Sequence, residues 1–163
     1  MKINYPDLEK IIEKLSAKKQ TISFAESCTG GRLAASFTSI SGASTVFHGS
    51  VVSYSNDIKK AWLGVTQETL EKHGAVSSQC VKEMLEGIST MTDTLKSDYA
   101  IAISGIAGPN GGTKEKPVGT VYIGLNTPTN QTIYKCLFKG DREQVQEQST
   151  LLAIEKLKEV LEI

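Results

Sequence analysis

The fold is decided by residues 99–112, which read Tyr99-Ala100-Ile101-Ala102-Ile103 and then Ser104-Gly105-Ile106-Ala107-Gly108-Pro109-Asn110-Gly111-Gly112. The first five are almost all apolar, which is typical of a strand buried on both faces. Four of the chain's 14 glycines fall in the nine residues that follow. Glycine lets the backbone approach a ligand closely, and open α/β sheets bind ligands at the carboxyl ends of strands. The loop is therefore either a ligand-binding element or a flexible connection built from turn residues.

Working outward from this strand, the hydrophobic periodicity predicts an alternation of helices and strands. In the first half, we expect a helix over residues 8–15, a strand at 21–25, a helix from Gly30 to Ile40, a strand at 46–54 and a short helix that Asn56 caps and that runs to Trp62. In the second half, we expect a helix at 66–73, an amphipathic helix at 81–95, the strand at 99–103, a strand pair at 119–125 and 132–138, and a last helix capped by Asp141. Helices and strands alternate early, and two strands pair late. The pattern predicts one α/β domain over residues 1–163, with three α/β/α layers and a mixed sheet.

The composition is that of an ordinary globular protein, with 39% hydrophobic and 22% charged residues among 163. The 18 Lys and Arg balance the 18 Asp and Glu, which argues against a protein that coats nucleic acid or an anionic membrane. No apolar run approaches the ~18 residues of a membrane span, and the polar residues before the first helix lead us to expect no signal peptide. The three cysteines match no metal or disulfide spacing, so we expect a cytoplasmic protein without a metal.

Residues 25–31, Ala-Glu-Ser-Cys-Thr-Gly-Gly, stand between a predicted strand and a predicted helix. Ser27 on such a turn can present its hydroxyl beyond the sheet edge, and the N–H groups of Thr29 and Gly30 would be free donors for an oxyanion or a phosphate. The alternative is that Ser27 or Thr29 caps the helix. Cys28 is either a second possible nucleophile or a small buried apolar residue.

A nucleophilic serine needs a base, and the two histidines are poor candidates. His73 falls at a predicted helix C-terminus, where a cation is favourable, and His48 has no evident partner. The remaining option is a lysine whose pKa is lowered by burial. Lys59 lies one helical turn after Asn56, just beyond a strand, and so fits this role. The alternative is that Lys59 and Lys60 are solvated helix lysines.

Taken together, the chain contains five motifs in a fixed order. They are residues 25–31, Tyr-Ser-Asn-x-x-Lys at 54–59, Ser-Gly-Ile-Ala-Gly-Pro-x-Gly-Gly at 104–112, Lys-Pro-Val-Gly-Thr-Val at 116–121 and Gly-Asp-Arg at 140–142. From about Leu8 to its C-terminus, the chain resembles the CinA C-terminal domain family. The stand-alone, PncC-type members of that family are nicotinamide-nucleotide amidohydrolases.

The resemblance implies a three-layer α/β domain that hydrolyses nicotinamide mononucleotide to nicotinic acid mononucleotide and ammonia, without a cofactor. Ser27 matches the family's nucleophile, Lys59 its general base, and Tyr54 a third member of the site. The glycine loop and Arg142 are expected to hold the phosphate and ribose, although Arg142 could equally be a solvated helix residue. The expected substrate-binding residues are Thr29, Gly30, Gly31, Ser104, Gly105, Ala107, Gly108 and Arg142.

Two other functions compete with the amidase. One is a non-catalytic nucleotide-binding module of the same fold, which would have no need to keep Ser27, Tyr54 and Lys59 together. The other is a competence-related interaction role, for which a net charge of zero and few aromatic residues give no sign of direct DNA binding. The resemblance also implies a homodimer or larger homo-oligomer, and we expect no N-terminal molybdopterin-binding-like domain.

Overall fold

A computed structural model describes residues 3–92, 94 and 96–163 of the chain. The helices are α1 (Tyr5–Ala17), α2 (Arg32–Thr38), α3 (Asn56–Leu63), α4 (Gln67–His73), α5 (Ser78–Ser89) and α6 (Arg142–Val160), with a 3-10 turn at Ala43–Thr45. The strands are β1 (Ile22–Glu26), β2 (Phe47–Val52), β3 (Tyr99–Gly105), β4 (Thr120–Asn126) and β5 (Gln131–Leu137). None of the helices in the described ranges is long and apolar enough to cross a membrane.

The strands form one mixed sheet in the order β2-β1-β3-β4-β5. β1 runs parallel to both β2 and β3, whereas β3, β4 and β5 pair in antiparallel fashion. β3 is the central strand, and its Ile101 lies opposite Phe24 of β1 and Leu125 of β4. The predicted mixed α/β sheet is confirmed.

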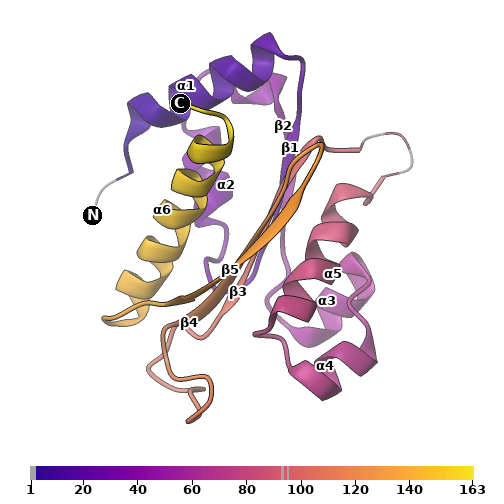
Figure 1. Cartoon of the computed structure of the whole chain (residues 1–163), viewed down its shortest axis with the longest axis vertical. Helices are drawn as coiled ribbons and strands as arrows, with labels where there is room; N and C mark the ends of the chain where they lie inside the picture. Colours follow the sequence, from indigo (N-terminus) through magenta and orange to yellow (C-terminus); the bar gives the residue numbers. More distant parts are fainter. Residues whose placement is uncertain (1–2, 93, 95) are drawn as a thin grey trace.

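The sheet separates two helical layers, with α1, α2 and α6 on one face and α3, α4 and α5 on the other (Figure 1). The alternation of side chains along β3 shows why both faces are covered. Ile101 and Ile103 enter the core beneath α1, α2 and α6, while Ala100 and Ala102 enter the core beneath α5. Burying one large aliphatic side chain contributes about 1.5–3 kcal/mol, so a strand that is apolar on both faces requires a helical layer on each side.

The structure differs from the sequence-based expectation at three helix boundaries. α2 begins at Arg32, not Gly30, because two positive φ angles, 59° at Gly30 and 95° at Gly31, make a tight turn first. α3 is capped by Ser55, whose hydroxyl accepts from the Ile58 N–H, so the expected cap at Asn56 is wrong by one residue. α5 ends at Ser89, short of the predicted end at position 95, which lies outside the described residues.

The three parallel strands end at the same edge of the sheet, which is where open α/β sheets present ligand sites. The segments after β1, β2 and β3 are the Ser27 turn, the Tyr54 segment and the glycine loop. β5 also ends at this edge, so α6 starts there and its Arg142 comes close to all three segments.

Candidate active site

A cavity of about 300 Å³ lies at this edge of the sheet. It draws its walls from segments that are far apart in the sequence. The lining residues are Ser27, Cys28, Tyr54, Asn56, Lys59, Ala75, Val76, Ser104, Gly105, Ile106, Ala107, Gly108, Asn110, Gly111 and Arg142. Of the eleven expected site residues, three do not line it: Thr29, Gly30 and Gly31.

Ser27 and Lys59 meet in this cavity. The Lys59 ammonium nitrogen Nζ lies 3.0 Å from the Ser27 hydroxyl oxygen Oγ. Both side chains are buried, with 2% of Lys59 and 7% of Ser27 exposed. A lysine is rarely buried without a partner, so its place beside a serine hydroxyl excludes the solvated-helix interpretation for Lys59.

A ring of hydrogen bonds fixes the approach of Lys59 to Ser27. The Ser53 N–H donates to the carbonyl of Glu26, which ties the end of β2 to the residue just before Ser27. The Ser53 carbonyl in turn accepts from Lys59 Nζ at 2.8 Å. The ring closes through the Lys59–Ser27 hydrogen bond. The amine is therefore positioned by backbone groups at the ends of β1 and β2.

Burial lowers the pKa of Lys59 below its ordinary value of 10.5. Among the described residues, no carboxylate lines the cavity to stabilise the protonated amine. The same low-dielectric surroundings act in the opposite direction on the neighbouring thiols, raising the pKa of Cys28 to about 12 and that of Cys80 to about 11. Burial thus shifts the amine and the thiols toward their neutral forms, which points away from a Cys28 thiolate as the nucleophile.

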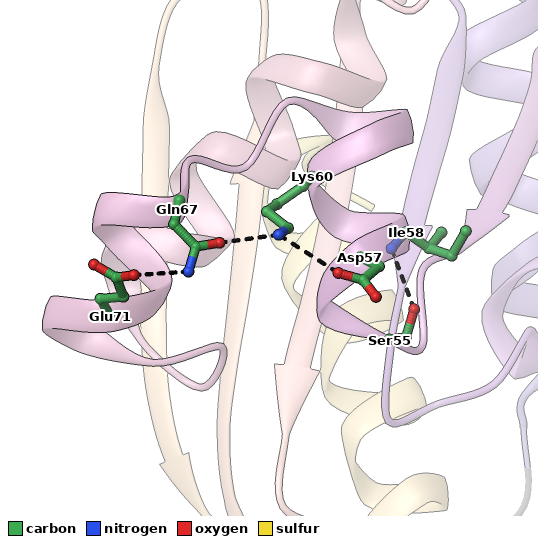
Figure 2. Close-up of polar contacts among 6 residues, drawn as sticks. All are labelled: Ser55, Asp57, Ile58, Lys60, Gln67 and Glu71. Carbon is green, nitrogen blue, oxygen red and sulfur yellow. Dashed lines mark hydrogen bonds and ion pairs between the residues drawn. The ribbon is translucent and has the colours of Figure 1, made fainter.

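The next residue, Lys60, shows how different its surroundings are. Figure 2 shows the Lys60 ammonium between Asp57 and Gln67, where it links α3 to α4 on the outside of the domain. The Gln67 amide continues the chain of contacts to Glu71. The expectation of a solvated helix lysine therefore holds for Lys60, whereas its neighbour Lys59 points inward to the cavity.

The start of α2 does not offer the free donors that the sequence suggested. The buried carboxylate of Glu26 accepts from the Leu33 and Ala34 N–H groups at 3.0 and 3.1 Å. It also accepts from the hydroxyls of Thr29 and Ser50. The carboxylate thus satisfies the helix N-terminus, and its negative charge suits the positive end of the helix dipole.

Within the turn, the expected role of Gly30 is wrong, because its N–H donates to the Ser27 carbonyl at 3.1 Å. The capping alternative for Ser27 is also wrong, since Gly31 is the N-cap of α2. In the described part of the chain, the N–H groups of Cys28 and Thr29 donate to no other residue, and the Cys28 N–H contacts its own thiol. Of these two residues, only Cys28 lines the cavity, which makes its N–H the better placed donor for an oxyanion.

Arg142 reaches the site from the first turn of α6 and bridges two of its walls. One guanidinium nitrogen, Nη2, donates to the Tyr54 phenol oxygen at 2.6 Å, and the other, Nη1, donates to the Gly108 carbonyl at 2.7 Å. Tyr54 is 60% exposed, and among the described residues its phenol contacts neither Ser27 nor Lys59. Tyr54 therefore lies at the rim of the cavity beside Arg142, and its expected role as a third member of the catalytic site stays a prediction.

The glycine loop forms the opposite wall, and all four of its expected residues line the cavity: Ser104, Gly105, Ala107 and Gly108. The Ser104 hydroxyl donates to the Ala75 carbonyl at 2.7 Å, which holds the segment before α5 against the loop. A Cβ atom at Gly105 would lie 2.6 Å from Val121 Cγ2, so the loop leaves the sheet too close to β4 for any side chain. The Gly108–Pro109 peptide bond is cis.

Neither histidine lines this cavity. His48 Nδ1 lies 3.5 Å from Ser97 Oγ, beside a separate small cavity, and the His73 carbonyl accepts from Lys116 Nζ at 2.6 Å. Across residues 3–92, 94 and 96–163, no three His, Cys, Asp or Glu side chains are grouped to hold a metal ion. The titratable groups that line the cavity are Cys28, Tyr54, Lys59 and Arg142.

Comparison with known proteins places this geometry in a family. The CinA C-terminal domain family matches residues 6–161. The chain belongs to this family. A CinA-like protein from Thermotoga neapolitana is 48% identical over 153 residues, which cover 94% of this chain and 36% of that protein. The chain thus spans about a third of the length of the curated relatives that it matches.

Solved CinA structures agree with the fold over the whole chain. A CinA superfamily protein from Klebsiella pneumoniae has a TM-score of 0.91 at 37% identity, covering 99% of both chains. A competence/damage inducible protein from Agrobacterium tumefaciens has a TM-score of 0.86 at 33% identity, covering 100% of both chains. The five-stranded mixed sheet flanked by helices is therefore the CinA fold.

Two features of this CinA-family site escaped the sequence analysis. Asn56 lines the cavity three residues before Lys59, and that helical spacing could have placed both on one face of α3. Gln146 is buried and donates to the Cys28 carbonyl at 2.8 Å. Its spacing of four residues from Arg142 on α6 was the available signal, because residues i and i+4 share a helix face.

Proposed function

We propose that this CinA-family domain hydrolyses the carboxamide of nicotinamide mononucleotide, giving nicotinic acid mononucleotide and ammonia. The observation that carries the proposal is the buried amine of Lys59, 3.0 Å from the Ser27 hydroxyl at the wall of a cavity. A serine beside a neutral lysine is a nucleophile beside its base, which is the arrangement that acyl transfer requires. The choice of nicotinamide mononucleotide among amides is supported by the resemblance to the PncC-type amidohydrolases.

In the first step, neutral Lys59 takes the proton of Ser27 as Oγ attacks the carboxamide carbon. One N–H of the amine is directed to the Ser53 carbonyl, which leaves its lone pair for the Ser27 hydroxyl. A covalent Oγ–carbon bond forms and the amide oxygen becomes an oxyanion. The N–H of Cys28, the residue after the nucleophile, is the donor beside it, in the position that many serine hydrolases use.

In the second step, protonated Lys59 donates its proton to the amide nitrogen, so that the carbon–nitrogen bond breaks and ammonia leaves. The enzyme now holds an ester between Ser27 and the nicotinoyl group. Water then gives a proton to Lys59 and attacks the ester carbon, and the collapse returns that proton to Ser27 Oγ. One water is consumed, the acid product gives its remaining proton to ammonia, and carboxylate and ammonium are released with the dyad restored.

The remaining walls of the cavity suit the nucleotide part of the substrate. Arg142 carries a positive charge at the cavity, and no acidic side chain of the described residues lines it, so an anionic ligand is favoured. Arg142 uses two of its five N–H donors on Tyr54 and Gly108, and the others are available for a phosphate. The single phosphate of a mononucleotide needs only this local site, which agrees with a net charge of zero for the chain.

The test is ammonia release from nicotinamide mononucleotide by the purified protein, with Ser27→Ala, Lys59→Ala and Cys28→Ser measured alongside. Turnover that is lost in Ser27→Ala and Lys59→Ala but kept in Cys28→Ser supports the proposal. A folded wild-type protein that releases no ammonia refutes it. Activity that survives in Ser27→Ala but not in Cys28→Ser would move the nucleophile to the thiol.

The second candidate is a nucleotide-binding module without catalysis. It is favoured by the exposed pair of Arg142 and Tyr54, which could bind a nucleotide whether or not Ser27 reacts. Such a module would bind nicotinamide mononucleotide in calorimetry with equal affinity in wild type and Lys59→Ala, and neither protein would release ammonia. The two candidates therefore give opposite results in the same ammonia assay.

A further inference from the structure

Three successive carbonyl groups, those of Ser27, Cys28 and Thr29, accept the hydrogen bonds that hold the turn in place. The Ser27 carbonyl accepts from the Gly30 N–H and the Thr29 carbonyl accepts from the Arg32 N–H, both at 3.1 Å. These two bonds are local and form wherever such a turn forms. The carbonyl between them, that of Cys28, receives no backbone N–H from the described part of the chain.

Gln146 supplies the missing bond from the other end of the sequence. Its side-chain nitrogen Nε2 donates to the Cys28 carbonyl at 2.8 Å, and the side chain is 8% exposed. A carbonyl oxygen can only accept, so the Gln146 atom that faces it must be the amide nitrogen. Gln146 does not line the cavity and therefore cannot act on a bound substrate directly.

The Gln146 hydrogen bond fixes the orientation of one of the two peptide groups that flank Cys28. In a trans peptide group the C=O and N–H point in opposite directions, so a bond that fixes one also fixes the other. The Ser27 carbonyl is fixed by Gly30, which sets the direction of the Cys28 N–H. Gln146 fixes the peptide group between Cys28 and Thr29. With both flanking peptide groups held, the backbone of Cys28 cannot turn its N–H away from Ser27.

We propose that Gln146 is a positioning residue, which holds the Cys28 N–H as the oxyanion donor of the Ser27 nucleophile. The inference rests on the proposed function, because it assumes that an oxyanion forms at Ser27. Loss of one direct oxyanion donor costs about 10²–10³ in kcat. Gln146 acts through a peptide group, so its loss should lower kcat by about 10-fold to 100-fold and leave KM within about twofold.

The experiment compares Gln146→Met, which keeps the side-chain volume but has no donor, with Gln148→Met as a matched control. Gln148 lies on the same helix and also donates to backbone carbonyls, those of Lys139 and Gln144, away from the cavity. Each protein is assayed for kcat and KM with nicotinamide mononucleotide. The rate at which a fluorophosphonate labels Ser27 is measured by mass spectrometry, since that reaction also develops charge on an oxygen beside Ser27.

A drop of at least tenfold in both kcat and labelling rate, confined to Gln146→Met and without a rise in KM, is the expected result. Values within twofold of wild type, or a change in KM alone, would overturn the inference. Gln146→Leu serves as a second variant, and if neither variant folds, Gln146 is a structural residue and the inference is wrong.

The labelling assay separates this inference from the proposed reaction. If wild type is labelled at Ser27 but releases no ammonia, the proposed substrate fails, and the labelling rate of Gln146→Met still decides the role of Gln146. If wild type is neither labelled nor active, no oxyanion forms at Ser27 and both proposals fail.

Discussion

The Ser27 turn (residues 27–31) and the glycine loop, taken here from Ser104 to the start of β4 (residues 104–119), face each other across the cavity, yet they are held in place differently. The turn is held by buried polar side chains: the carboxylate of Glu26, the amide of Gln146 and the amine of Lys59. The loop has few such side chains and is shaped by close backbone approaches at its glycines. Side chains that bond it to neighbouring segments include the Ser104 hydroxyl and two basic residues at the periphery, Arg142 and Lys116.

The difference suggests that the turn positions the reacting serine, whereas the glycine loop provides space and N–H groups for a ligand. Hydrogen bonds that cross from one element to another hold atoms to within a few tenths of an ångström, which a reacting serine requires. Glycine-rich backbone offers N–H groups and space to a ligand without fixing one orientation. We therefore expect changes in the turn to lower kcat, and changes in the loop and its basic residues to alter stability or KM.

The largest effect is expected for Lys59→Met, which removes the proposed base of the turn and puts an unbranched apolar side chain in its place. We expect kcat for nicotinamide mononucleotide to fall by about 10³-fold or more, because general-base catalysis supplies about 10²–10⁴. Lys60→Met is the matched control, since Lys60 is the adjacent lysine and its ammonium contacts Asp57 of α3 and Gln67 of α4. Equal loss in the two variants would show that the effect is not specific to the buried amine.

On the side of the loop, Gly119→Ala should act on stability. A Cβ atom there would lie 2.0 Å from the Phe138 carbonyl oxygen, and φ is +94°. We expect the free energy of unfolding, measured by urea denaturation, to fall by about 3 kcal/mol. Gly111→Ala shares a positive φ of 91°, but its nearest contact would be 3.6 Å, so it should lose only about 1 kcal/mol. A similar loss in both would mean that the close approach at Gly119 relaxes easily.

The same contrast explains which parts of the molecule the sequence could predict. The period of the apolar residues and the turn residues predict the elements, the mixed sheet and the edge that carries the site. The turn and the loop were found because their motifs are contiguous. Gln146 was missed because its partner Cys28 is 118 residues away, and a polar residue on a helix gives no sign of which carbonyl it meets.

The wrong expectations have a related cause. The N–H of Gly30 was expected to be free because helix starts leave such donors unpaired. The structure satisfies those donors with Glu26, whose carboxylate reaches forward to Leu33 and Ala34. A buried carboxylate in this role depends on the path of the whole turn. Two successive positive φ angles, at Gly30 and Gly31, set that path. The local sequence pattern shows two glycines but does not reveal these angles.

A smaller effect should come from Arg142→Ala, which removes the cation that bridges Tyr54 and Gly108. We expect KM for nicotinamide mononucleotide to rise about tenfold with little change in kcat, because a remote phosphate contact supplies equal binding in ground and transition states. Lys116→Met is the control, since Lys116 also binds a backbone carbonyl beside the loop but does not line the cavity. An unchanged KM in Arg142→Ala would remove the guanidinium from the substrate site.

The finest test of the turn is the pH dependence of stability. Burial lowers the pKa of Lys59 in the folded protein, while in the unfolded chain the pKa is about 10.4. Between these two values the unfolded state binds more protons than the folded state, so the stability of the wild type must rise with pH there. Below the lowered pKa both states are protonated, and the full cost of burying the charge remains.

Lys59→Met has no such group, so its free energy of unfolding should lack this rise. We therefore expect the difference in urea unfolding between wild type and Lys59→Met to shift in favour of wild type as the pH is raised toward 10. Lys60→Met, which changes an exposed side chain, should follow the wild type. A wild-type curve parallel to that of Lys59→Met would mean that Lys59 keeps its ordinary pKa and could not serve as a neutral base near pH 7.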